Sequence, residues 1–132
     1  MRDSAGNLYG TNVNYGADGS GVLFKLDTAG NLIVLHSFGS GPGGYQSSGL
    51  VITSAGTIYG STASGGGTGC LGYGCGAIFQ VGTAGDFSAV YTFGGGADGE
   101  GHQIALSPTG ALYGDAEGGA DGGGILYRLR LQ

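Results

Sequence analysis

The apolar residues of this chain fall into short runs that alternate with glycine and small polar residues. The runs are four to eight residues long and rich in Val, Ile, Leu, Phe and Tyr, with Gly, Asp, Asn or Ser at their boundaries. This pattern is typical of strands joined by turns. No stretch of useful length carries apolar residues at the 3.6-residue spacing of an amphipathic helix. The sequence therefore predicts an all-β protein.

One phrase occurs three times and sets the period of the chain. It reads Ser-Ala-Gly-Asn-Leu-Tyr-Gly at residues 4–10, Ser-Ala-Gly-Thr-Ile-Tyr-Gly at 54–60, and Ser-Pro-Thr-Gly-Ala-Leu-Tyr-Gly at 107–114. Each copy is expected to form a turn and then a short strand that stops at the glycine. The tyrosines at positions 9, 59 and 113 are 50 and then 54 residues apart. That spacing is in the range expected for a repeat built from one four-stranded sheet.

The other strands recur as well. Residues 21–26 match 76–81 and 124–129, residues 32–38 match 87–93, and residues 49–52 match 103–106. If residues 49–52 open a sheet, the chain holds three strands, then four, then three. The expected fold is a β-propeller-like array of four-stranded antiparallel blades, a partial propeller of about two and a half blades per chain. It forms a single domain, 1–132, with repeat units at approximately 3–48, 49–102 and 103–132.

The ends of this array are expected to be incomplete. The first unit lacks its opening strand and the third lacks its closing strand, whereas a sheet with two apolar faces needs neighbours on both sides. We therefore expect a homo-oligomer that forms through the unpaired end blades. The alternative is a truncated fragment in which crystal or filament contacts substitute for missing repeats.

Composition narrows the range of partners. The 34 glycines do not follow a Gly-X-Y period, so they separate strands rather than build a collagen-like chain. Nine acidic residues against four basic ones give a net charge of −5, which disfavours nucleic acid or an anionic membrane as a partner. No apolar run approaches the roughly 20 residues that span a bilayer.

With these residues laid out, the chain resembles the GloVer tandem repeat family of exported bacterial proteins. The resemblance rests on residues 3–11, 21–27 and 34–38, and it is looser in the second copy, where Gln80-Val81-Gly82 replaces Lys-Leu-Asp. It implies a propeller-like fold, distantly similar to Kelch blades, and no established catalytic motif. It also implies an extracellular or cell-surface location. Met1 leads straight into the first repeat without a signal peptide or anchor, which suggests a piece of a longer exported protein.

Cys70 and Cys75 lie in the one insertion that lengthens a repeat. Four residues separate them and glycines surround them, so the segment can bend back into a local disulfide in an oxidising compartment. Free thiols are the alternative. A metal site would need further Cys or His at suitable spacing.

The tetrapeptide Gly-Ala-Asp-Gly occurs at residues 16–19, 96–99 and 119–122. Carboxylates in such loops can bind calcium, and Asp18, Asp98 and Asp121 would then be the ligands. Asp-Gly is also what a tight turn prefers, and that interpretation is the simpler one. No other cofactor is expected.

Two carboxylate pairs lie close together along the chain: Asp98 with Glu100, and Asp115 with Glu117. Carboxylates about 5–9 Å apart can hydrolyse glycosides. Asp115 stands where the other copies have Thr or Ser after Tyr-Gly, and His102 is expected near a propeller axis. Asp98, Glu100, His102 and Asp115 are thus the catalytic candidates. Solvation of the surface also explains the carboxylate at Asp115, and it is the preferred interpretation.

Three tyrosines, Tyr15, Tyr45 and Tyr73, are expected in loops or connections. Loop tyrosines among Ser, Asn and Gly offer rigid amphipathic surface for binding carbohydrate or protein. The alternative is that they cover the glycine-rich surface of their own sheet. His36, equivalent to Tyr91, is expected to have a packing or hydrogen-bonding role.

The preferred interpretation is an extracellular propeller-type repeat module that serves as a non-catalytic scaffold for binding or assembly. A small secreted polysaccharide hydrolase with carboxylate acid/base groups is the second. A self-assembling propeller fragment without activity of its own is the third.

Overall fold

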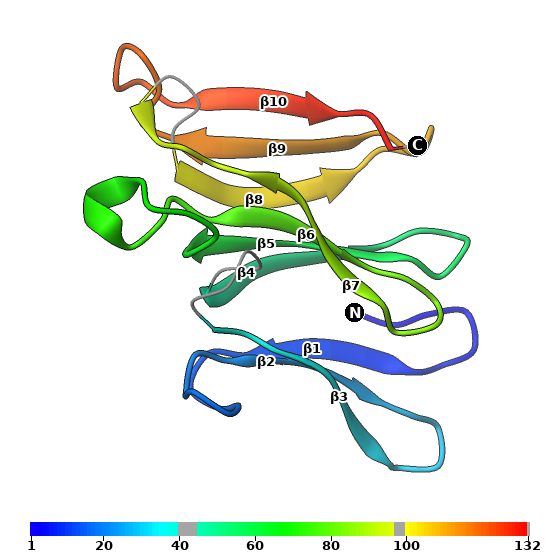
Figure 1. Ribbon diagram of the computed structural model, residues 1–132. Coiled ribbons are helices and arrows are strands. Elements are labelled where there is room, and N and C mark those ends of the chain that lie inside the picture. The colour runs from blue at the N-terminus through cyan, green and yellow to red at the C-terminus, as the bar shows by residue number, and fades with distance from the viewer. Residues whose placement is uncertain (40–44, 97–99, 132) are drawn as a thin grey trace.

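The computed structural model describes residues 1–39, 45–96 and 100–131. These residues form three antiparallel sheets and no α-helix (Figure 1). Sheet 1 consists of β1 (Leu8–Asn12), β2 (Val22–Leu26) and β3 (Leu32–Ser37). Sheet 2 consists of β4 (Tyr45–Ile52), β5 (Ile58–Ser64), β6 (Ala77–Val81) and β7 (Phe87–Thr92). Sheet 3 consists of β8 (Glu100–Leu106), β9 (Leu112–Glu117) and β10 (Ile125–Leu129). The expected order of three, four and three strands is confirmed.

The sheets stack in chain order, with sheet 2 between the other two, as blades do in a propeller (Figure 1). Strand β8 of sheet 3 lies against β4 and β5 of sheet 2, and β1 of sheet 1 lies near β4. The array is not closed, so sheets 1 and 3 each have one face without a neighbouring sheet. Within the described part of the chain, no helix is long and apolar enough to cross a membrane.

The two ends of the stack differ in the way the strands are connected. At one end are five tight turns of similar geometry, at residues 3–7, 27–31, 53–57, 82–86 and 107–111. In each turn the first residue donates its backbone N–H to the carbonyl of the last, and a glycine has a positive φ. In four of them a side-chain oxygen of the first residue accepts a hydrogen bond from the last N–H. We call this the turn end.

At the other end of the stack, the strand that carries the Tyr-Gly pair and the strand that follows it are joined by longer connections (β1 to β2, β5 to β6 and β9 to β10). These span residues 12–22 in sheet 1, 64–77 in sheet 2 and 117–125 in sheet 3, and they differ in length and sequence. Because they join equivalent strands, all three leave the sheets on the same side (Figure 1). We call this side the loop end.

The glycine of the repeated Tyr-Gly pair lies inside a strand. The expectation that the strand stops at this glycine is wrong, because β1, β5 and β9 all continue beyond it. Each glycine is paired with an aromatic residue of the next strand: Gly10 with Phe24, Gly60 with Phe79, and Gly114 with Tyr127. A Cβ at any of these glycines would overlap that aromatic ring. The glycine therefore makes room for a ring that lies over its own sheet.

Two of these rings, Phe79 and Tyr127, take part in the two apolar cores, one at each junction between sheets. The core between sheets 1 and 2 contains Leu23, Phe38, Ile58, Phe79 and Val81. The core between sheets 2 and 3 contains Tyr59, Cys75, Ile78, Phe93, Leu112 and Ala116, with Tyr127 partly buried against it. Burial of apolar surface between sheets is therefore what holds the stack together.

His36 has the packing role expected for it. Its imidazole stacks on the ring of Phe87 in sheet 2, with centroids 3.5 Å apart and planes 2° from parallel. It also meets Phe38 edge to face at 5.1 Å. Burial among these rings disfavours the charged imidazolium and lowers the pKa of His36 below its ordinary value of 6.5.

The first prediction concerns the glycine beneath the ring. Gly60→Ala should destabilise the protein because its Cβ would overlap the Phe79 ring, and overpacking typically costs about 1–3 kcal/mol. Gly123→Ala is the matched control, since no atom lies within 4 Å of a Cβ at that position. Urea unfolding measures both free energies, and an equal loss in the two variants would contradict the role of Gly60.

The second prediction concerns pH. Because the folded state lowers the pKa of His36, the unfolded chain binds more protons as pH falls below about 6.5, and stability should decrease there. His36→Phe keeps an aromatic ring against Phe87 but removes the titratable group, so it should reduce this loss. Unfolding free energies at pH 7.5 and pH 5 test this, and an unchanged pH dependence in His36→Phe would contradict it.

Candidate functional site

Most of the functional candidates from the sequence that the structure describes gather at the loop end. Tyr15 lies in the connection of sheet 1 and Tyr73 in that of sheet 2. Asp18 and Asp121 lie in the connections of sheets 1 and 3, and His102 is at the start of β8. Asp98 lies outside the described residues. Among those described, no group of three or more His, Cys, Asp or Glu side chains is arranged to hold a metal ion.

Tyr45 was expected in a loop, and this is wrong for its backbone. It is the first residue of β4, where it pairs with Ser64 of β5. A register shift between Ser47 and Gly49 lets β4 extend beyond the short run at residues 49–52. A β-bulge of this kind interrupts the alternation of side chains along the strand, so the apolar pattern predicts a strand only from residue 49 onward.

The predicted disulfide joins Cys70 and Cys75, with an S–S distance of 2.08 Å. Cys75 is buried in the core between sheets 2 and 3, so the bridge ties the loop to that core. Between the cysteines, Leu71 and Tyr73 are exposed at the tip of the loop. The tip is therefore a rigid projection with an apolar and an aromatic side chain on its surface.

The backbone of this loop is fixed at several points. Gly65 donates to the carbonyl of Tyr73 at 2.8 Å, and Gly74 donates to that of Gly69 at 2.8 Å. Cys70 and Leu71 have positive φ angles of 53° and 61°, a region that residues other than glycine rarely adopt. Such conformations persist only where the surroundings enforce them, and here the disulfide and the two hydrogen bonds do so.

The loop of sheet 1 is tied back in a simpler way. The N–H of Gly21 donates to the carbonyl of Tyr15 at 2.6 Å, and the N–H of Gly19 donates to Gly16 at 3.2 Å. The side chain of Tyr15 remains largely exposed. Both loop tyrosines thus have exposed side chains, while their own backbone carbonyls accept hydrogen bonds from glycine N–H groups.

His102 lies between two carboxylates. Its Nδ1 is 3.8 Å from Oδ2 of Asp115, and its Nε2 is 3.9 Å from Oε2 of Glu117. Asp115 also accepts a hydrogen bond from the backbone N–H of Gln103 at 3.0 Å. Glu100, the other described candidate, faces Glu117 across the β8–β9 pair. The structure therefore brings three candidates from the sequence together with Glu117.

Glu117 was noted in the sequence only as a neighbour of Asp115. Residues two apart on a strand share a face, so placing both on one strand could have brought Glu117 into the candidate set. Both separations between the imidazole and the carboxylates are longer than a hydrogen bond, so the three groups are neighbours without direct contact for proton transfer. All three side chains are more than half exposed, so water surrounds the cluster.

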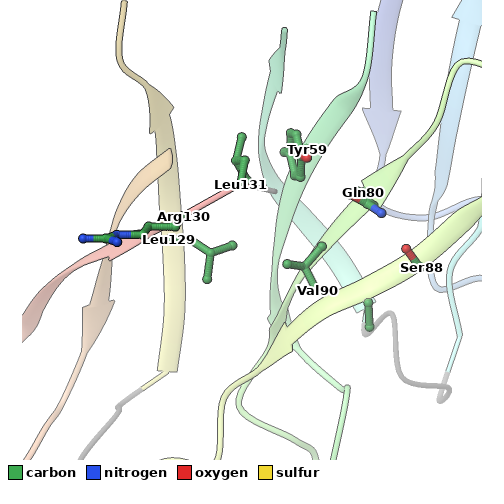
Figure 2. A pocket seen from close by; sticks show the side chains of 8 residues that line it. Tyr59, Gln80, Ser88, Val90, Leu129, Arg130 and Leu131 are labelled. Carbon is green, nitrogen blue, oxygen red and sulfur yellow. The ribbon is translucent and has the colours of Figure 1, made fainter. Parts of the chain in front are cut away.

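A separate cavity of about 400 Å³ lies between sheets 2 and 3, near the turn end. Tyr59, Gln80, Ser88 and Val90 line it from sheet 2, and residues 129–131 line it from the other side (Figure 2). The matching cavity between sheets 1 and 2 is only about 80 Å³, and the β6–β7 turn (residues 82–85) forms part of its wall. In the described residues, sheet 3 has no such turn. The larger cavity is therefore a consequence of the three-stranded sheet, and it contains none of the candidates.

The third prediction concerns the disulfide. Replacing both cysteines by Ala should lower the free energy of unfolding by about 2 kcal/mol, the cost expected for opening a loop of this length. Exchange of the amide hydrogens of Gly65 and Gly74 should accelerate, because their acceptors lie in the freed loop. Leu71→Ala at the exposed tip is the control and should leave the free energy of unfolding and the exchange rates unchanged. Unaltered exchange in the double variant would contradict the role of the bridge.

Comparison with known proteins agrees with this architecture. Among solved structures, the chain is similar to one described as a "putative gluconolactonase", with 15% identity and a TM-score of 0.56. The alignment covers 100% of this chain and 47% of that one, so the chain spans about half the length of that structure. At this identity the likeness shows the propeller-like fold alone. No curated protein matches the chain significantly. The model of the Gloeobacter/Verrucomicrobia repeat matches residues 1–132, and the chain belongs to that repeat family.

Proposed function

We propose that this protein is a non-catalytic binding module that binds carbohydrate at its loop end. The observation that carries the proposal is the exposure of Tyr15 and Tyr73 on loops that leave two sheets on the same side. The turn end repeats one geometry five times, whereas the three connections of the loop end all differ. Variation confined to one end of a regular scaffold is typical of a binding surface.

The chemistry of these loops suits a sugar. An exposed tyrosine ring can stack on the apolar face of a pyranose while its hydroxyl forms hydrogen bonds. The residues around Tyr15 include Asn12, Asn14 and Asp18, which supply amide and carboxylate groups for sugar hydroxyls. The loop end carries acidic side chains and no Lys or Arg in its three connections, so this open surface fits an uncharged polysaccharide better than an anionic one.

The rigidity of the loops supports binding as well. The disulfide and the hydrogen bond from Gly65 fix the backbone beside Tyr73, and the bond from Gly21 fixes it beside Tyr15. Less conformational entropy is therefore lost when a ligand binds. The disulfide also favours an oxidising location outside the cytoplasm, where a bacterial surface polysaccharide would be met.

Hydrolysis of a polysaccharide is the second candidate, and the proximity of His102 to Asp115 and Glu117 favours it. An imidazole beside carboxylates can act as a general base. The exposure of all three groups argues against it, because proton transfer groups gain most from a site that excludes water.

The fourth prediction tests binding on an array of bacterial polysaccharides. Tyr15→Ala and Tyr73→Ala should each weaken retention by roughly two- to tenfold, as expected from about 0.5–1.5 kcal/mol for one ring contact. Tyr113→Ala, a partly exposed tyrosine near the turn end, is the control and should bind as the wild type does. Retention that is equal in all variants would contradict the proposed surface.

The same array separates the two candidate functions. Release of reducing sugar ends that disappears in Asp115→Asn would replace the binding module by the hydrolase. Binding without any release of sugar supports the module.

A further inference from the structure

Equivalent residues of the three sheets can be compared directly, because the pairs β1–β2, β5–β6 and β9–β10 have the same register. Leu23, Ile78 and Leu126 occupy one position, opposite Thr11, Ser61 and Asp115 respectively. Leu8, Ile58 and Leu112 occupy another, opposite Leu26, Val81 and Leu129. The first position faces the following sheet of the stack and the second faces the preceding sheet.

Wherever a neighbouring sheet is present, these positions are buried. Leu23 and Ile78 are each 0% exposed, whereas Leu126 on the free face of sheet 3 is 80% exposed. Ile58 and Leu112 are 3% and 0% exposed, whereas Leu8 on the free face of sheet 1 is 45% exposed. The two free faces are thus the two halves of a junction that the chain itself forms twice.

The details of the two halves match. Ile78 of sheet 2 shares one apolar cluster with Ile125 and Tyr127 of sheet 3. At the same positions sheet 1 has Val22 and Phe24, which line an apolar groove of about 450 Å³ on its free face. Val34 and Leu32 line this groove too and are exposed. The free face of sheet 1 therefore offers the surroundings that Leu126 lacks within its own chain.

From this repetition we propose that the free face of sheet 3 packs on the free face of sheet 1 of a second copy of this chain. The contact is head to tail and uses different surfaces of the two partners, and such contacts either close into a ring or continue as a filament. The solved propeller-like structure has about twice the aligned length of this chain, since the alignment covers 47% of it. Two copies therefore supply the chain length of one such fold, which favours a closed pair.

The new junction is smaller than the two within the chain. Sheet 3 has three strands in the described residues, and so does sheet 1, so each half presents fewer side chains than sheet 2 does. Strand β8 of sheet 3 lies beside Ser61 of sheet 2, whose hydroxyl donates to the carbonyl of His102. In the described part of the chain, sheet 1 has no strand equivalent to β8. The cluster of His102, Asp115 and Glu117 accordingly stays open in the pair. Association is expected to depend on concentration.

The fifth prediction is tested by the mass of the protein in solution over a series of concentrations. The wild type should shift from the mass of one chain to that of two as concentration rises. Leu126→Lys and Leu8→Lys should each remain a single chain, because each places a charge in one half of the junction. Leu71→Lys makes the same change at the exposed tip of the disulfide loop and should assemble as the wild type does. Val34→Lys provides a second variant on the face of sheet 1, in case Leu8→Lys does not fold.

A mixture of Leu126→Lys and Leu8→Lys distinguishes a head-to-tail contact from a symmetric one. The first variant keeps an intact sheet 1 face and the second an intact sheet 3 face, so a mixed pair has one unaltered junction and one that carries both lysines. The mixture should therefore show the two-chain mass at concentrations at which each variant alone remains a single chain. A wild type that stays a single chain at its highest soluble concentration would overturn the proposal. So would a two-chain mass that survives Leu126→Lys, or a mixture that does not associate.

Discussion

The contact between a glycine and an aromatic ring of the neighbouring strand is the constraint on which the rest of this structure depends. Because Gly60 has no side chain, the Phe79 ring can lie across the surface of its own sheet. The ring then fills the space toward the preceding sheet, where Leu23 and Phe38 meet it. The Gly114–Tyr127 pair of sheet 3 repeats this arrangement toward sheet 2, so both junctions of the stack contain the same local feature.

This contact also explains how sheets with few large side chains can pack against each other. A glycine beneath a ring lets two sheets approach without a layer of long side chains, and the apolar area is supplied by a few aromatic and branched residues. At the turn end, side-chain oxygens and glycines fix the conformation of the turns. Connections that differ in length and sequence therefore lie at the loop end. Structural and variable positions are thereby separated in space.

Much of the fold could be predicted from the sequence, because it depends on local patterns. The repeats of the Tyr-Gly phrase and of the apolar runs predict ten strands in groups of three, four and three, as observed. The disulfide between Cys70 and Cys75 follows from their close spacing among glycines. The two cysteines are close in sequence, and the strand pattern occurs in three copies, so both features can be recognised without knowledge of the pairing between strands.

What the sequence did not predict depends on pairing between strands. The role of Gly60 inside β5 is visible only once Phe79 is known to lie opposite it. The proximity of His102 to Glu117 depends on a register shift between Gly101 and Ile104, which interrupts the regular pairing of β8 with β9 at His102. Likewise, the extension of β4 to Tyr45 requires a bulge, and a bulge leaves no alternation of apolar residues to recognise.

The loop that carries the disulfide has a narrow neck. Gly65 and Cys75 form an isolated bridge, and the N–H of Gly76 donates to the carbonyl of Gly65 at 3.1 Å. The strands β5 and β6 are therefore closed off before the loop begins, and residues 66–74 lie beyond that closure. A foreign peptide grafted between the two cysteines would be displayed as a constrained cycle on an unaltered sheet, which makes this fold a natural platform for presenting selected sequences.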